Sequence, residues 1–176
     1  VRNIQPFLTE MGFGSFAIAH NGNLINAERL RTSLVETGSL FQSTTDTEVI
    51  IHLVARSHQN EPVDRLVEAL QQVAGAYALV SVVDDKLIGV RDPNGIRPLI
   101  LGQLGEAYIL ASETCALDII GAEYIRDIEP GEMVVISKDG VSSQKISTEK
   151  PSRFCIFEYI YFARPDSSLE GRSVYQ

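Results

Sequence analysis

Residues 20–23, His-Asn-Gly-Asn, bring together polar atoms that could stabilise a negative charge. They follow the apolar residues 16–19, which predict a strand, and asparagine and glycine both tolerate the positive φ of a sharp turn. Such a turn would point a backbone N–H outward beside the Asn21 amide. Two fixed donors suit an oxyanion, because they are already oriented toward the atom on which the negative charge develops. The alternative is an ordinary hairpin turn, for which Asn-Gly is a strong signal.

Asp46 is a second candidate binding group. Thr45 and Glu48 have the spacing of a capping box, which predicts that a helix begins here with Asp46 in its first turn. In that position the carboxylate either interacts with the helix dipole or faces a pocket and binds the ammonium group of a ligand. Both interpretations remain open from the sequence.

The elements that must position these groups can be read from apolar periodicity. Residues 1–15 read as a loop with a turn, and a strand follows at residues 13–19. Helices are predicted at residues 27–34 with Asn26 as N-cap, from Thr45 onward, and from Pro62. Hairpins are predicted at residues 77–83 with 87–90 and at residues 99–101 with 107–111. A short helix is predicted at residues 112–120, and short strands at residues 125–128, 133–137 and 141–146. This order favours two packed sheets with helices outside them.

Two further segments stand out. Residues 91–98 form a dense turn segment with two arginines and an aspartate, expected to be a loop pinned by its own charge pairs. After Ile146 the chain becomes polar and linker-like at residues 147–152, and then strongly aromatic at residues 154–162. An aromatic strip of this kind needs burial, either against the sheet or against a further domain.

Composition excludes several classes of function. The chain has 176 residues, enough for one domain with a sizeable core. Its net charge of −8 argues against a general nucleic-acid surface. No apolar run approaches the roughly 20 residues of a membrane span, and no signal peptide is evident. The two cysteines, Cys115 and Cys155, fit a reducing compartment, so we expect a cytoplasmic protein.

Four motifs in order resemble the glutaminase domain of the class II glutamine amidotransferases, at residues 19–24, 44–48, 91–99 and 112–118. A fifth, at residues 157–167, resembles the start of the connection to the phosphoribosyltransferase half of the amidophosphoribosyltransferase family. That family makes phosphoribosylamine in the first step of purine synthesis. The resemblance implies a glutaminase domain over residues 1–150 and the start of this connection over residues 151–176.

The resemblance implies a four-layer αββα sandwich of the N-terminal-nucleophile type, an α+β fold, incomplete at its N-terminus. In this family an N-terminal cysteine attacks the side-chain amide of glutamine, and its own α-amine is the base. The family's oxyanion hole corresponds to the Asn21 side chain and the Gly22 N–H. Asp46 would bind the α-ammonium group of glutamine. His20 is placed with the substrate-binding residues, where it would shape the turn rather than act as a base.

The nucleophilic cysteine of the family would precede Val1, so the chain resembles a fragment, and we expect it to release no ammonia from glutamine by itself. Cys115 could replace that cysteine, but a small buried side chain is the favoured interpretation. Cys155 corresponds to a ligand of the structural [4Fe–4S] cluster that some members carry. A buried structural cysteine is an equal alternative, because such a cluster needs four thiolates.

The remaining implications concern the whole protein. A phosphoribosyltransferase domain that binds Mg²⁺ and phosphoribosyl pyrophosphate would follow Gln176, and the full-length protein is expected to form a homo-oligomer. One alternative is another class II amidotransferase, such as those that make asparagine or glucosamine 6-phosphate. The other is a non-catalytic domain that has lost its nucleophile.

Overall fold

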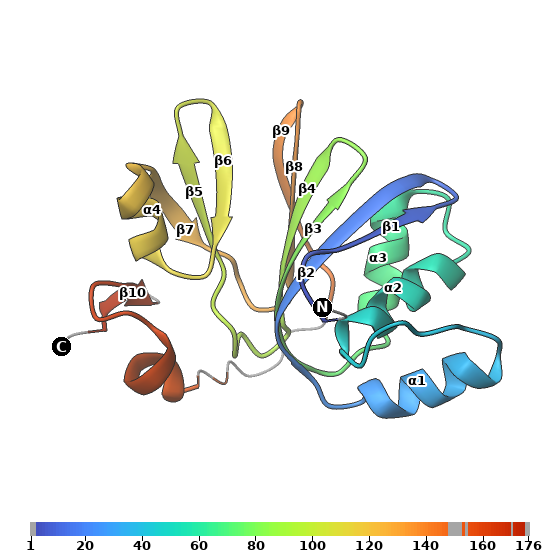
Figure 1. Cartoon of the computed structure of the whole chain (residues 1–176). Helices are drawn as coiled ribbons and strands as arrows, with labels where there is room; N and C mark the ends of the chain where they lie inside the picture. Colours follow the sequence, from blue (N-terminus) through green and yellow to red (C-terminus); the bar gives the residue numbers. More distant parts are fainter. Residues whose placement is uncertain (1–2, 148–152, 154, 170, 175–176) are drawn as a thin grey trace.

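The computed structural model describes residues 3–147, 153, 155–169 and 171–174. Figure 1 shows four layers, in which two antiparallel sheets face each other and helices cover their outer faces. The predicted αββα arrangement is therefore confirmed. No helix in this described part of the chain is long and apolar enough to cross a membrane.

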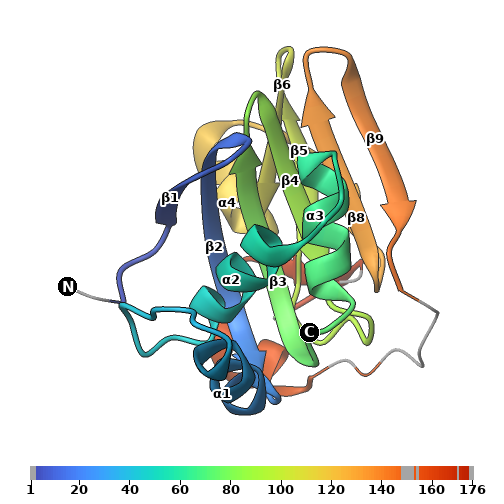
Figure 2. The ribbon, with the colours of Figure 1, turned by 90° about the vertical axis from the view of Figure 1, so that its right-hand side faces the viewer.

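The larger sheet has the strand order β1-β2-β3-β4-β8-β9, and all neighbours are antiparallel. Its strands are β1 (Phe7–Met11), β2 (Gly14–Leu24), β3 (Gly75–Val83), β4 (Lys86–Arg91), β8 (Glu132–Ser137) and β9 (Gly140–Lys145). The helices α1 (Ala27–Glu36), α2 (Thr47–Arg56) and α3 (Pro62–Leu70) lie over its outer face, as Figure 2 shows.

The smaller sheet has the order β6-β5-β7, and α4 (Thr114–Ile120) covers its outer face (Figure 1). Its strands are β5 (Ile100–Leu104), β6 (Ala107–Ala111) and β7 (Glu123–Asp127). Near the C-terminus lie a short π-helix, η1 (Glu158–Phe162), and a two-stranded ribbon of β10 (Ser168–Leu169) and β11 (Arg172–Ser173). Residues 148–152 of the linker predicted at residues 147–152, and the domain boundary at residue 150, lie outside the described residues.

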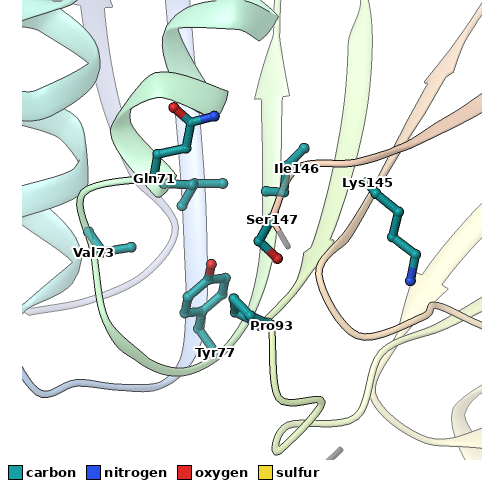
Figure 3. A pocket seen from close by; sticks show the side chains of 8 residues that line it. Gln71, Val73, Tyr77, Pro93, Lys145, Ile146 and Ser147 are labelled. Carbon is teal, nitrogen blue, oxygen red and sulfur yellow. The ribbon is translucent and has the colours of Figure 1, made fainter. Parts of the chain in front are cut away.

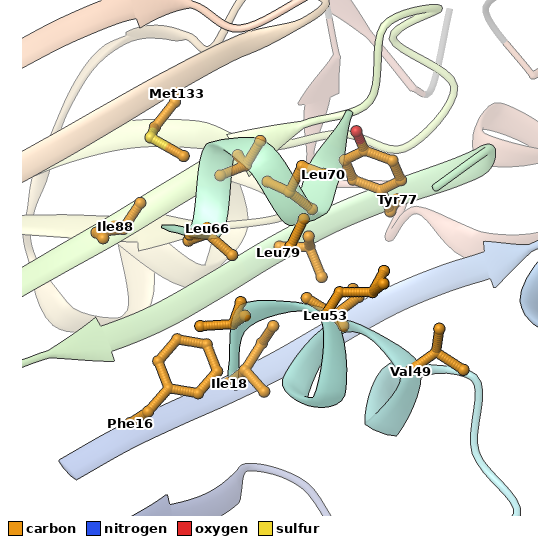
Figure 4. Close-up of a cluster of buried hydrophobic side chains, with 14 of the residues drawn as sticks. Phe16, Ile18, Val49, Leu53, Leu66, Leu70, Tyr77, Leu79, Ile88 and Met133 are labelled. Carbon is orange, nitrogen blue, oxygen red and sulfur yellow. The ribbon is translucent and has the colours of Figure 1, made fainter. Parts of the chain in front are cut away.

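The main core lies between the helices and the larger sheet. Figure 4 shows side chains from β2, α2, α3 and β3 meeting there, among them Phe16, Ile18, Leu53, Leu66 and Leu79. Because side chains alternate across a strand, Phe16 and Ile18 of β2 face the helices, and Ala17 and Ala19 face the smaller sheet. This alternation decides where the polar residues at the end of β2 point.

The structure corrects the local predictions in the first hairpin and at the start of the first helix. Residues 7–11 form strand β1 instead of a loop, because they pair along β2 from Phe7–Ile18 to Met11–Gly14. Asn26 occupies the predicted N-cap position of α1, but its side chain makes no capping hydrogen bond. Its amide instead donates to Gln72 O and accepts from Ala74 N–H, which joins the start of α1 to the segment before β3.

Candidate active site

Residues 20–23 do not form the predicted turn. They continue strand β2, and Asn21 and Gly22 pair with Ala78 and Tyr77 of β3. Gly22 has φ +148°, and a Cβ built there would lie 2.0 Å from the carbonyl oxygen of Ala76. The glycine is therefore required by the close approach of β3, since any side chain would collide with that backbone.

His20 points toward the helices, as the alternation of β2 requires. Its side chain is only 1% exposed, and its Nδ1 lies 3.1 Å from Thr47 Oγ1 and 3.5 Å from Asp46 Oδ1. Its backbone N–H donates to the side-chain oxygen of Gln5. The buried His20 ring thus contacts Asp46 and Thr47, both at the start of α2.

Asn21 lies on the opposite face of β2 and is exposed. It lines a hollow of about 320 Å³ between the two sheets, together with Gln5, Leu99 and Ser112. Its Oδ1 accepts a hydrogen bond of 2.7 Å from Arg97 Nη2. Sequence reasoning missed this contact, because it joins residues 76 positions apart and leaves no local pattern.

Asp46 stands at the N-cap position of α2, directly before the helix. Its Oδ2 accepts a hydrogen bond of 2.8 Å from the N–H of Leu24, at the end of β2. Asp46 lines a second hollow of about 390 Å³ together with Asn23, Arg31 and Thr44. The Asn21 amide at the end of β2 and the Asp46 carboxylate bonded to that end thus each line a hollow.

The capping box predicted from Thr45 and Glu48 is not formed. Glu48 instead accepts hydrogen bonds of 2.7 Å from the backbone N–H groups of Gln42 and Ser43, and one of 2.5 Å from Ser43 Oγ. The Glu48 carboxylate is therefore engaged by the segment that precedes α2. Asp46 is fixed by Leu24 and His20 rather than by a cap.

The electrostatic environment keeps Asp46 charged. Burial raises the pKa of this carboxyl, but the hydrogen bonds from His20 and from the N–H of Leu24 outweigh burial and lower the pKa to about 2. A carboxylate that is ionised at neutral pH and lies beside a hollow suits a cationic ligand.

The lowered pKa of Asp46 predicts a pH effect on the stability of the chain. The folded pKa of about 2 lies below the ordinary value of 3.8, so the contribution is present above pH 3.8 and is lost as the pH falls through about 2. We expect the free energy of unfolding to fall less steeply between pH 4 and pH 2 in Asp46→Asn than in the unchanged chain. Urea unfolding at several pH values measures both slopes, with the exposed Asp85→Asn as the control. Equal slopes in Asp46→Asn and the unchanged chain would contradict this account.

The loop of residues 91–98 is pinned, but the side chains of Asp92 and Arg91 hold it through backbone groups, where charge pairs within the loop were expected. The buried Asp92 carboxylate accepts from the N–H groups of Asn94, Ile96 and Arg97 at 2.9–3.2 Å. Arg91 donates to three carbonyl groups, those of Gly95, Arg97 and Ile128, each at 2.9 Å. These hydrogen bonds therefore hold the loop backbone, including that of Arg97, in one conformation.

The two cysteines lie away from the end of β2. Cys115 is buried at the start of α4, in the outer layer, where its Sγ lies 3.7 Å from Glu113 Oε2. Cys155 is half-buried and free, three residues before η1. Among the described residues, no three His, Cys, Asp or Glu side chains lie close enough to hold a metal ion. These residues alone do not make a cluster site, so Cys155 remains one predicted ligand.

A larger cavity of about 540 Å³ opens beside Pro93, in the loop of residues 91–98. Figure 3 shows the Tyr77 hydroxyl pointing into it between Gln71 and Ser147. No residue predicted for the site lines this cavity.

Known proteins resemble the chain in sequence and structure. Residues 1–118 match the family model described as "Glutamine amidotransferase domain". An amidophosphoribosyltransferase of Rhizobium etli is 49% identical over 99% of this chain and 36% of its own length. Amidophosphoribosyltransferase 2 of Arabidopsis thaliana, described as chloroplastic, is 48% identical over the whole chain and 32% of its own length.

A solved structure of glutamine phosphoribosylpyrophosphate amidotransferase from Bacillus subtilis, complexed with ADP and GMP, superimposes with a TM-score of 0.96. It is 45% identical and covers 99% of this chain, which covers 38% of that one. The chain thus spans about a third of the length of the curated relatives it matches. The family match covers two thirds of the residues, and the chain belongs to the glutamine amidotransferase domain family.

Proposed function

We propose that the chain is the glutaminase part of an amidophosphoribosyltransferase. The whole protein would convert glutamine and phosphoribosyl pyrophosphate to phosphoribosylamine, glutamate and pyrophosphate, the first step of purine synthesis. The observation that carries this proposal is the placement of the Asn21 amide and the Asp46 carboxylate around the end of one strand. The amidophosphoribosyltransferases at 45–49% identity support it.

Each end of glutamine has a partner in this arrangement. Asp46 would bind the α-ammonium group, with His20 holding the carboxylate from behind. Asn21 Nδ2 and the N–H of Gly22 would donate to the oxygen of the side-chain amide as it becomes negative. Because these donors act at the reacting carbonyl, they stabilise the transition state more than the bound substrate.

The nucleophile is proposed to be a cysteine thiolate outside this chain. It would attack the amide carbon, the C–N bond would break, and the ammonia would leave with the proton held by the cysteine's α-amine. Water would then release glutamate from the thioester. Cys115 and Cys155 take no part in this proposal, since neither lines the hollow that holds Asn21.

The remaining parts of the proposal concern the whole protein. Mg²⁺ and phosphoribosyl pyrophosphate would bind in the phosphoribosyltransferase part, and residues 151–176 would begin the connection to it. Exposed apolar residues on and before η1 fit burial against that part, namely Ile156, Phe157, Ile160, Tyr161 and Phe162. We further propose a cytoplasmic homo-oligomer, and Cys155 as one ligand of a [4Fe–4S] cluster.

The test uses the full-length protein that contains this chain. With glutamine, phosphoribosyl pyrophosphate and Mg²⁺, we expect glutamate and pyrophosphate in equal amounts, and ammonia should replace glutamine in forming pyrophosphate. Glutamate formed without pyrophosphate would indicate another class II amidotransferase and overturn the proposed acceptor. Pyrophosphate formed with ammonia but never with glutamine would indicate a glutaminase domain that has lost its activity.

A further inference from the structure

We propose that Arg97 is a positioning residue for the oxyanion hole, because it fixes the orientation of the Asn21 amide while Glu158 fixes Arg97. The inference rests on the proposed role of Asn21 as an oxyanion donor. It assigns a function to the loop of residues 91–98 and to η1, neither of which supplies a group that contacts glutamine in the proposed site.

The contact between Arg97 and Asn21 determines which atom of the amide is available. A guanidinium group has only donors, so the Asn21 atom that lies 2.7 Å from Nη2 must be the oxygen. Nδ2 then points elsewhere, and it has no hydrogen-bond partner among the described residues. An amide turned by 180° would present its oxygen to the developing oxyanion and repel it. The contact therefore selects the orientation that can catalyse.

The backbone of Arg97 is itself held from two sides. Its N–H donates to the buried Asp92 carboxylate at 3.0 Å, and its carbonyl accepts from Arg91 Nε at 2.9 Å. The side chain of Arg97 thus starts from a fixed point. A long side chain that begins from a fixed point loses less freedom when it makes its own contacts.

The guanidinium group is held at its far end by η1. Nη1 lies 2.6 Å from Glu158 Oε1, and the Glu158 side chain is only 3% exposed. Burial raises the pKa of Glu158, the Arg97 guanidinium opposes this rise, and the nearby Glu113 carboxylate adds to it. The ring of Phe162 lies 5.2 Å from Arg97 Cζ, within the range of a cation–π contact.

These contacts make η1 part of the site. Glu158 is 61 residues from Arg97 in the sequence and acts on Asn21 through one intervening side chain. Since both ends of the guanidinium group are engaged, a change in the position of η1 is transmitted to the amide that would bind the oxyanion.

The experiment measures glutamine hydrolysis by the full-length protein and its Arg97→Met variant, which removes every donor and keeps an unbranched side chain. We expect kcat to fall about 10-fold, within the range typical for partners that orient a functional group. The KM for glutamine should stay within about 2-fold, because Asn21 acts mainly in the transition state. Ammonia-dependent synthesis should not change.

A double variant separates positioning from a general loss of structure. If Arg97 acts only through Asn21, then adding Arg97→Met to Asn21→Ala should slow hydrolysis no further. The matched control is Arg126→Met, which breaks a similar pair with Glu132, at 2.7 and 2.9 Å, on β7 and β8. It should change the melting temperature without changing kcat.

A conservative variant covers the case in which Arg97→Met fails to fold with an unpaired Glu158. Arg97→Lys keeps the charge but lacks the two Nη donors that contact Asn21 and Glu158 together. Its kcat should therefore lie between those of Arg97→Met and the unchanged protein. Unchanged kcat in Arg97→Lys and Arg97→Met, or losses that multiply in the double variant, would overturn the inference. If Asn21→Ala alone leaves kcat unchanged, the proposed role of Asn21 fails instead.

Discussion

Replacing Asn21 by alanine in the full-length protein is expected to lower kcat for glutamine hydrolysis by roughly 10²–10³-fold, the usual cost of one oxyanion donor. The side chain is exposed at the end of β2, and Arg97 holds its oxygen, so alanine removes the amide donor and leaves the strand in place. The KM for glutamine should change much less, because the donor acts on charge that exists mainly in the transition state. Steady-state kinetics with glutamine measure both constants.

The control for Asn21→Ala is Asn60→Ala, at an exposed position before α3, which should leave both constants unchanged. A rise in KM with unchanged kcat would make Asn21 a ground-state binding residue. That result would remove the oxyanion hole from the end of β2.

Asp46→Asn is expected to raise the KM for glutamine by roughly 10-fold to 150-fold, since a charge-assisted contact is worth ~1.5–3 kcal/mol at ~1.4 kcal/mol per tenfold change. The substitution keeps the shape of the side chain and removes the charge that the site maintains down to a pH of about 2. Ammonia-dependent synthesis should continue at its normal rate, because ammonia does not need the glutamine site.

The competing explanation is that Asp46 only complements the dipole of α2. Asp64 provides the matched control, because it lies in the first turn of α3 and has no part in the site. If Asp46→Asn and Asp64→Asn both lower the melting temperature slightly and leave the KM unchanged, then Asp46 does not bind substrate.

The layers of the fold could be predicted from the sequence because they depend on local patterns. The hairpin of β3 and β4 and the helix at Pro62 formed where apolar spacing and turn residues placed them. The end of β2 was predicted wrongly because its conformation depends on β3, about 50 residues later. Only that pairing explains why Gly22 extends the strand instead of turning it.

The candidate site divides in the same way. Asn21, Gly22 and Asp46 could be named because they belong to short motifs. The support around them could not, since Leu24 and His20 hold Asp46 across 22 and 26 residues. Arg97 and Glu158 were visible only as members of a charged loop and an aromatic strip. Side chains that act through others leave no periodicity in a single sequence.

The pairing of β2 with β3 also has a consequence for how the full-length protein refolds. The pairs β1–β2, β3–β4, β5–β6 and β8–β9 are closed by short turns, but three helices separate β2 from β3. Closing a long loop costs chain entropy that is offset only once the paired strands make their contacts, so non-local pairings form slowly. Asn21 and Gly22 lie in this slow ladder. We therefore expect the glutaminase activity of the full-length protein to recover from denaturant only after this long-range pairing has formed.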